Sequence, residues 1–216
     1  MFPSPDSLVD GLPDELLDGF ARSWGTRSFV PQTVLIQEGD EGDSMFILHS
    51  GRVKIFASGD AGRELVLDEL GRGQCFGELS LDGARRSVSV KTLQATTCTV
   101  VSGANLQEAF KQYPSLAPHL MMRLIRMVRR LTEQVKRMAL QDVYGRVVGV
   151  LMELSDPVGQ TRVLRQRLTQ QDIADRVGSS REMVHRVMRE LAIGGYVGTD
   201  STTRLLIIRK RFPQAW

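Results

Sequence analysis

The segment LTQQDIADRVGSSREMVHRVMRELAIGGYVGTD, residues 168–200, is the most informative part of the sequence for the fold. Thr169 is suited to cap one helix and Gly178 to close it, while Ser180 would cap a second helix that begins at Arg181. Apolar residues recur at helical spacing to form the inward faces: Ile173, Val177, Val184, Val187 and Leu191. Two short helices joined by a glycine turn predict a helix-turn-helix arrangement.

The residues around this segment extend the prediction on both sides. Tyr196-Val197 and the apolar run at 205–208 flank the polar turn DSTTR, which indicates a β-hairpin wing. Upstream, residues 139–152 are expected to form a helix, and SDPVGQT at 155–161 is expected to be a loop by its composition.

Four polar side chains of the second helix share the side opposite its apolar residues: Arg181, Glu182, His185 and Arg186. The first turns of a recognition helix meet base edges in the major groove, where arginine bonds guanine and glutamate accepts from cytosine. Thr169, Gln171 and Ser180 are placed to hold backbone phosphates. The alternative is an ordinary helical hairpin with a salt-bridged surface, but a carboxylate on this face favours base reading.

The charge distribution separates the two halves of the chain. Residues 1–116 contain 10 Lys/Arg and 16 Asp/Glu, a net charge of −6, whereas residues 117–216 contain 18 and 9, a net charge of +9. The positive charge of the second half can also be explained by solvent-exposed helix surfaces that bind no partner. Together with the helix-turn-helix pattern, it indicates that the second half meets a polyanion.

Composition excludes several classes of protein. The 216 residues are 42% hydrophobic, contain no apolar run of about 18 residues, and begin without the basic and apolar blocks of a signal peptide. The two cysteines cannot form a disulfide scaffold, so we expect a reduced, cytoplasmic setting and no membrane partner. There is no Walker A loop, nucleophile elbow or zinc-type cluster, so no catalytic or metal site and no enzymatic activity are expected.

The first half shows a different periodicity. Residues 7–24 predict a helix, and from residue 29 short apolar runs alternate with glycines: VLI at 34–36, MFIL at 45–48, VKIF at 53–56, LVL at 65–67, SVSV at 87–90 and TCTVV at 97–101. Regular short strands with turn signals favour a β-sandwich or barrel. Residues 58–62 are expected to connect two strands of a hairpin.

A long helix is expected between the two halves. The chain becomes helical from Leu106, and after Pro118 one apolar stripe continues through Leu120, Leu124, Met127, Leu131, Val135 and Met138. Several cations lie off or beside this stripe: Arg123, Arg126, Arg129, Arg130 and Lys136. The stripe is suited to pack on the protein's own barrel or to form a two-fold dimer seam, and its low charge favours the dimer.

The stretch FGELSLDGARRSVSV, residues 76–90, contains glycines, a carboxylate, two arginines and a hydroxyl. Such residues suit a socket for a small anionic ligand, because arginine supplies both charge and hydrogen-bond donors to a phosphate. They equally suit a polar turn between strands. Both interpretations remain open on the residues alone.

The whole chain resembles the CRP/FNR family of bacterial transcription regulators, through GDEGDSMFILHSGRVKIF at 39–56, the GELSLDGARRSVSV loop and SSREMVHR. This resemblance implies a two-domain α+β fold. A β jelly roll resembling cyclic-nucleotide-binding domains would occupy residues 1–115, a dimerisation helix residues 116–138, and a winged helix-turn-helix DNA-binding domain residues 139–216.

The resemblance also implies site residues. A cyclic nucleotide, either cAMP-like or cyclic di-GMP, would bind at Gly77, Glu78, Leu79, Arg86, Ser87 and Thr132. Glu78 would accept the ribose 2′-hydroxyl, Arg86 and Ser87 would hold the cyclic phosphate, and Arg85 would face solvent. The loop is about one residue shorter than the usual binding loop, and Leu131 replaces one of the two hydroxyl residues that contact the base.

Partners and rival effectors follow from the same resemblance. A homodimer would read palindromic DNA with TGTGA-like half-sites through Arg181, Glu182 and Arg186, and residues 155–161 correspond to a surface that contacts RNA polymerase in some relatives. An iron–sulfur cluster needs about four cysteines, so no such prosthetic group is expected. Cys75 or His49 as a haem ligand is less favoured than a structural role. The alternative is a regulator with a degenerate, ligand-independent barrel, or one that senses another small effector.

Overall fold

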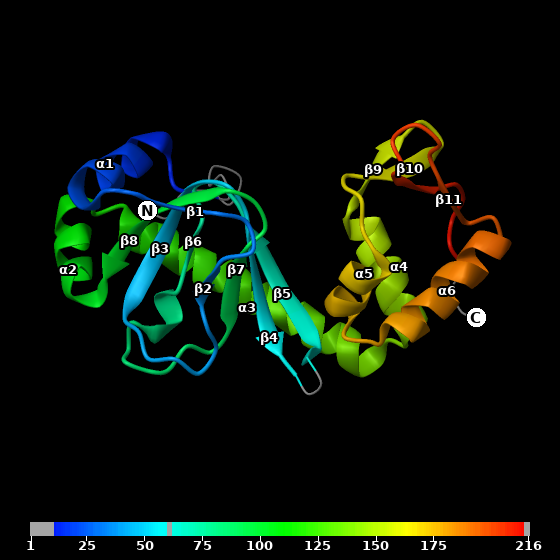
Figure 1. Cartoon of the computed structure of the whole chain (residues 1–216), viewed down its shortest axis with the longest axis horizontal. Helices are drawn as coiled ribbons and strands as arrows, with labels where there is room; N and C mark the ends of the chain where they lie inside the picture. The colour runs from blue at the N-terminus through cyan, green and yellow to red at the C-terminus, as the bar shows by residue number, and fades with distance from the viewer. Residues whose placement is uncertain (1–10, 60–61, 214–216) are drawn as a thin grey trace. The chain divides into compact units, whose positions relative to one another are not determined.

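The computed structural model describes residues 11–59 and 62–213 (Figure 1). The chain forms two compact units that divide between Arg130 and Leu131. Each unit has its own hydrophobic core. Within the described residues, no helix combines the length and the apolar character needed to cross a membrane.

Two four-stranded antiparallel sheets form the N-terminal unit (Figure 1). The first has the order β1-β8-β3-β6, with β1 (Arg27–Phe29), β8 (Thr96–Ser102), β3 (Ser44–Ser50) and β6 (Cys75–Phe76). The second has the order β2-β7-β4-β5, with β2 (Val34–Ile36), β7 (Ser89–Thr92), β4 (Val53–Ser58) and β5 (Glu64–Leu70). The apolar runs read from the sequence therefore lie in strands, and the predicted fold class is confirmed.

The connections between strands match the sequence in part. β4 and β5 are antiparallel neighbours with Ser58 opposite Glu64, as the predicted hairpin requires, although two residues of its turn lie outside the described residues. The strand predicted from residue 87 begins only at Ser89. The backbone of Arg86 explains the delay, because its amide and carbonyl bond Asp40 and Gly39 in a loop.

Two helices cover one end of this unit, α1 (Asp14–Trp24) and α2 (Gly103–Gln112) (Figure 1). Of the helix predicted over 7–24, the first residues lie outside the described range, and Pro13 occupies the capping position. α2 begins three residues before Leu106, directly after β8. Phe20 is fully buried against Met45 and Ile47, so this end of the barrel is closed by apolar packing.

The long helix α3 (Leu116–Leu140) has Pro118 in its first turn, where a missing N–H breaks no helical bond. Leu116 and Leu120 pack into the core of the barrel. The predicted stripe was therefore wrong at Leu120, which faces the protein's own core. The large apolar side chains that α3 exposes are Met121, Ile125, Val128, Val135, Met138 and Leu140.

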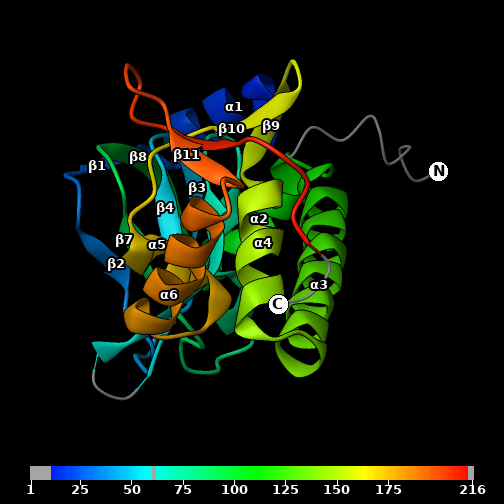
Figure 2. The same ribbon diagram turned by 90° about the vertical axis from the view of Figure 1, so that its right-hand side faces the viewer.

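The C-terminal unit packs three helices beside a small antiparallel sheet (Figure 2). The helices are α4 (Val143–Glu153), α5 (Gln170–Val177) and α6 (Arg181–Ile193). The sheet has the order β11-β12-β10-β9, with β9 (Ser155–Val158), β10 (Thr161–Leu164), β11 (Val197–Thr199) and β12 (Leu206–Ile208). β11 and β12 form the predicted wing hairpin.

Two predictions about this unit were wrong. Residues 155–161 are not a loop, because β9 and β10 pair as a hairpin around Gly159; Pro157 is tolerated since β9 is an edge strand. The helix predicted over 139–152 begins at Val143, because α3 continues to Leu140 and the Asp142 side chain then accepts a bond from the Gly145 amide at 2.8 Å.

The caps of the helix-turn-helix are confirmed. The Thr169 hydroxyl accepts from the Asp172 amide at 3.1 Å, and the Asp172 carboxylate accepts from the Thr169 amide at 2.7 Å, which forms a capping box. Gly178 ends α5 with a left-handed φ of 63°. Ser180 then caps α6 by accepting from the Met183 amide at 3.2 Å.

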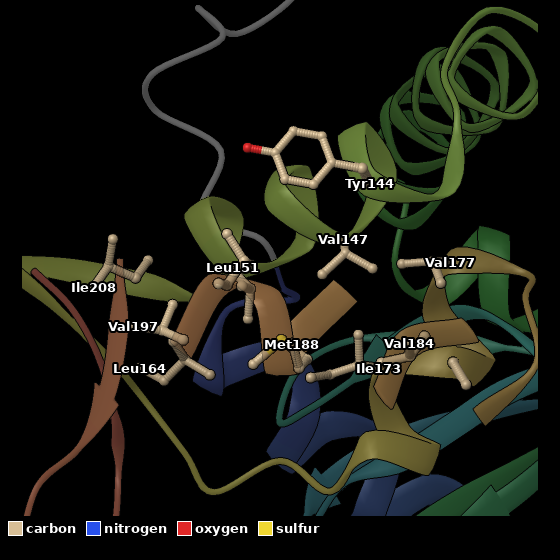
Figure 3. Close-up of a cluster of buried hydrophobic side chains, with 12 residues drawn as sticks. Tyr144, Val147, Leu151, Leu164, Ile173, Val177, Val184, Met188, Val197 and Ile208 are labelled. Atoms are coloured by element: carbon tan, nitrogen blue, oxygen red, sulfur yellow. The ribbon is translucent and has the colours of Figure 1, made fainter. Parts of the chain in front are cut away.

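The core of the C-terminal unit fixes α6 on α4 and α5. Figure 3 shows side chains from these helices and from the small sheet converging, among them Leu151, Leu164 and Met188. Met188 is buried, whereas Val187, predicted to point inward, is only half-buried. The Tyr144 hydroxyl lies at the margin of the cluster and donates to the Pro213 carbonyl at 2.9 Å.

Replacing Thr169→Ala removes one half of the capping box. We expect the free energy of unfolding of the C-terminal unit to fall by about 1 kcal/mol in a urea titration, because an orphan amide loses its partner. Thr169→Ser is the matched control and should retain nearly all of the stability. Equal losses in both variants would contradict the assignment of the cap.

Candidate functional site

A tight turn begins the loop that the sequence singled out. Gly77 follows β6 with φ 86°, and a short 3₁₀ helix, η3 (Glu78–Ser80), comes next. A Cβ atom at Gly77 would lie 2.7 Å from the Ser44 carbonyl oxygen and 3.1 Å from the Arg86 guanidinium. Only glycine combines this conformation with such close packing. The turn therefore brings Glu78 and Arg86 into one region.

Arg86 is held inside the loop by backbone carbonyls. Its side chain donates to the Gly77 oxygen at 2.8 Å and to the Ser44 oxygen at 3.0 Å, and the residue is only 8% exposed. These bonds use two of the five N–H groups of the guanidinium. Burial lowers the pKa of Arg86, and the nearby Asp43 carboxylate opposes that shift. The result is a buried cation beside the turn.

Glu78 is paired with a residue of the long helix. Its Oε1 lies 3.2 Å from Arg123 Nη2, and its side chain is only 7% exposed. Glu78 Oε2 and Arg123 Nε are buried with no hydrogen-bond partner. Buried polar atoms are nearly always bonded, so this oxygen can accept a further hydrogen bond and this N–H group can donate one. Cys75 lies against the same pair, and burial raises the pKa of its thiol to about 12.

The other predicted ligand-binding residues lie outside this buried pair. Leu79 and Ser87 are exposed, and Thr132 is exposed on the part of α3 that belongs to the second compact unit. Arg85 faces solvent, as expected, with its guanidinium 3.3 Å from Glu41. The structure thus brings together Gly77, Glu78 and Arg86. It adds Arg123, which the sequence indicated as a cation beside the apolar stripe of the long helix but not as a partner of Glu78.

The residues considered as haem ligands have structural partners instead. His49 Nε2 lies 2.8 Å from the Thr99 hydroxyl, and both Cys75 and Cys98 are buried free thiols. Among the described residues, no group of three or more His, Cys, Asp or Glu side chains is arranged to hold a metal ion.

The second candidate site is the exposed side of α6. Val184, Met188 and Leu191 are buried, and the opposite side presents the four predicted reading residues, all exposed: Arg181, Glu182, His185 and Arg186. Hydrogen bonds from its own backbone amide and from the Ser180 hydroxyl lower the pKa of Glu182. The helix therefore offers an acceptor between cations.

Side chains around α6 hold this surface in place. His185 Nδ1 lies 3.1 Å from Gln170 Oε1 on α5, and Gln171 donates to Asp175 at 2.7 Å. The hydroxyls of Thr169 and Ser180 are occupied as caps of α5 and α6. The N-terminal amides of a helix are suited to bind anions, so the predicted phosphate contacts would fall on these helix ends rather than on the hydroxyls alone.

Comparison with known proteins identifies the two domains that carry these candidate sites. Residues 26–113 match the family model of the cyclic nucleotide-binding domain, and residues 145–211 match that of the Crp-like helix-turn-helix domain. The cAMP-activated global transcriptional regulator CRP of Haemophilus influenzae is 31% identical over 185 residues, which is 82% of each chain. The chain belongs to the CRP/FNR family.

Further members of the CRP/FNR family support this assignment. A CRP-like cAMP-activated global transcriptional regulator of Mycobacterium tuberculosis is 32% identical over 174 residues, 78% of each chain. The solved structure of the c-di-GMP responsive global regulator CLP of Xanthomonas campestris has a TM-score of 0.81 and 26% identity, and the match covers 92% of this chain and all of that one. The protein is a DNA-binding transcription regulator with a cyclic nucleotide-binding domain, and not an enzyme.

Arg123→Met would leave the Glu78 carboxylate buried without its cation. We expect the free energy of unfolding of the N-terminal unit to fall by about 3 kcal/mol, because a buried charge without a partner is strongly destabilising. The double variant Glu78→Gln/Arg123→Met should recover most of that loss in urea titrations. Additive losses in the double variant would contradict the coupling of this pair.

Proposed function

We propose that the protein is a homodimeric transcription regulator whose affinity for DNA is controlled by a cyclic nucleotide, cAMP-like or cyclic di-GMP. The ligand would bind at Gly77, Glu78, Leu79, Arg86, Ser87 and Thr132. One observation carries the proposal: Glu78 Oε2 is buried without a hydrogen-bond partner, and the carbonyl of the preceding residue, Gly77, accepts a bond from the buried Arg86 cation. A ribose hydroxyl supplies the donor that this oxygen lacks.

The part of the loop that contains Arg86 and Ser87 is suited to bind the phosphate of the ligand. Arg86 retains donors beyond the two that bond the Gly77 and Ser44 carbonyls, and the adjacent Ser87 hydroxyl is exposed. Charge-assisted bonds from arginine to a phosphate are about twice as strong as neutral ones. Relatives described as cAMP-activated and as c-di-GMP responsive support an effector of this class.

Arg123 connects the proposed nucleotide site to the long helix. It belongs to α3 and pairs with Glu78. A ribose hydroxyl that donates to Glu78 would therefore alter the ion pair that holds this helix against the barrel. A ligand shifts a conformational equilibrium only through different contacts in the two states, and this pair is such a contact. We place the joint between the long helix and the DNA-binding unit at residues 137–142.

A second copy of the chain is the occupant that we propose for the exposed apolar row of α3. Met121, Ile125 and Val128 follow one another at steps of four and three, and Val135 and Met138 continue this spacing. Such a row forms one seam along a helix, and in a two-fold dimer each copy contributes the same seam.

The DNA partner follows from α6. We propose that Arg181, Glu182 and Arg186 read TGTGA-like half-sites of a palindrome, with Thr169, Gln171, Ser180 and His185 at the backbone and flanking positions. The two half-sites would bind the two copies of α6. RNA polymerase would contact the hairpin of β9 and β10, and the protein would act in the cytoplasm.

A ligand-independent regulator is the second candidate. It is favoured by the protein partners that Arg86 and Glu78 have: Arg86 bonds two backbone carbonyls, and Glu78 pairs with Arg123. In that case the pocket is a structural remnant, and no cyclic nucleotide would bind or alter the affinity for DNA.

Isothermal titration of cyclic nucleotides into the purified, nucleotide-stripped protein separates the two candidates. Arg86→Leu should weaken binding by about 10- to 100-fold, because charge-assisted bonds to the phosphate are lost. Arg85→Leu is the matched control, since the neighbouring arginine is exposed, and it should bind like the parent. Equal affinities in parent and Arg86→Leu, or no binding by the parent, would reject the proposed pocket.

Base reading by Glu182 has its own test. In Glu182→Ala, we expect the preference for one base pair of the half-site to fall by about 10-fold in competition binding with single-position DNA variants. Glu190→Ala, an exposed carboxylate near the other end of α6, should leave every preference unchanged. An unaltered preference profile in Glu182→Ala would show that this carboxylate does not read a base.

A further inference from the structure

A second ion pair joins the barrel to the long helix. The Asp68 carboxylate on β5 contacts the Arg130 guanidinium on α3, and the Asp68 side chain is only 12% exposed. Asp68 Oδ1 also accepts from the Glu69 amide at 2.9 Å. Arg130 lies seven residues after Arg123, which is about two helical turns and about 10 Å along the same face.

The two pairs form one electrostatic group. Burial raises the pKa of Asp68, and both Arg130 and Arg123 oppose that shift, so Arg123 lies near Asp68 as well as Glu78. The Asp68–Arg130 pair of β5 and α3 therefore lies in the same neighbourhood as the Glu78–Arg123 pair of η3 and α3. The Arg130 side chain is 42% exposed, so the Asp68 pair is only partly buried. Ion pairs of either kind add little net stability compared with apolar packing. The unpartnered Glu78 Oε2 and Arg123 Nε also leave the group incomplete.

We propose that this group selects a guanine base, with Asp68 and Arg130 as the residues that determine specificity for a cyclic guanine nucleotide. The inference rests on the proposed function, because it extends the same pocket from the phosphate and ribose ends, at Arg86 and Glu78, to the base. It narrows the ligand class to nucleotides such as cyclic GMP or cyclic di-GMP.

The chemistry of the two purines supports guanine. Guanine presents two neighbouring donors, N1–H and the N2 amino group, and two neighbouring acceptors, O6 and N7. A carboxylate matches the two donors, and a guanidinium forks onto the two acceptors. Adenine presents a donor beside an acceptor on each edge, which an amide matches and neither Asp68 nor Arg130 does.

Ligand binding then exchanges one set of partners for another. Asp68 and Arg130 are each other's charged partners, and in the proposed complex guanine would bond both of them. Each carboxylate oxygen has two lone pairs, so Asp68 can keep the Glu69 amide while it accepts from guanine. Guanine leaves neither charge without a partner, whereas adenine sets an acceptor against the carboxylate and a donor against the guanidinium.

The test is isothermal titration of the full-length, nucleotide-stripped protein with cyclic AMP, cyclic GMP and cyclic di-GMP. We expect at least one guanine nucleotide to bind about 10- to 100-fold more tightly than cyclic AMP. Preference for cyclic GMP or for cyclic di-GMP distinguishes a mononucleotide site from a dinucleotide site, and either supports the inference. Asp68→Asn should reduce or invert the guanine preference, because an amide matches adenine.

Controls separate this inference from the function on which it rests. Glu69→Gln changes the neighbouring carboxylate, which pairs with Arg52 at 2.7 Å, and should keep the parental preference. Asp68→Ser is a second variant in case Asp68→Asn does not fold, and it should also lose the preference for guanine. The inference would be overturned if the parent bound cyclic AMP more tightly than both guanine nucleotides, or if folded Asp68 variants kept the parental preference. In either case, nucleotide binding that depends on Arg86 would still support the proposed function. Binding of none of the three nucleotides would reject the function itself.

Discussion

The ion pair between Glu78 and Arg123 is the interaction on which this account depends. It is nearly excluded from solvent, and it connects a loop of the barrel to the helix that leads out of the N-terminal unit. A buried charge is tolerated only with a partner, so each residue fixes the position of the other. The pair is also incomplete, since one oxygen and one N–H group lack partners. Such an ion pair can hold the long helix against the loop, and its unpartnered oxygen can still accept a hydrogen bond from a ligand.

The fold makes this contact possible by packing glycines against polar groups. Gly77 lets the backbone turn against the Ser44 carbonyl, and Gly42 leaves space for the Arg86 guanidinium, which lies 2.8 Å from where a Cβ atom would be. Leu116 and Leu120 anchor the start of α3 in the barrel core, so the next turns present Arg123 and Arg130 to the carboxylates. Apolar packing therefore fixes the rotation of α3 about its axis, and this rotation decides which arginines face the barrel.

Structural features that depend on neighbouring residues were predictable from the sequence, and contacts between residues far apart in the chain were not. The helix-turn-helix could be placed almost to the residue, because Thr169, Gly178 and Ser180 act within one turn of their own positions. β9 was missed, because a proline on an edge strand looks like a loop until its neighbour is known. Arg123 and Arg130 were recognised as cations of the long helix, but their pairing with Glu78 and Asp68 was not predicted, for the same reason. Which arginines of a long basic helix face the barrel depends on packing that no local pattern records.

Coupling between the nucleotide site and the DNA-binding surface can be measured as a change in DNA affinity. Fluorescence anisotropy would give the affinity of the full-length protein for a duplex with two inverted TGTGA half-sites, with and without saturating cyclic nucleotide. If the nucleotide takes Glu78 from Arg123 and thereby shifts α3, the affinity should increase by about 5- to 150-fold, the usual range of such coupling. Identical affinities, with the nucleotide shown to be bound under the same conditions, would contradict the account.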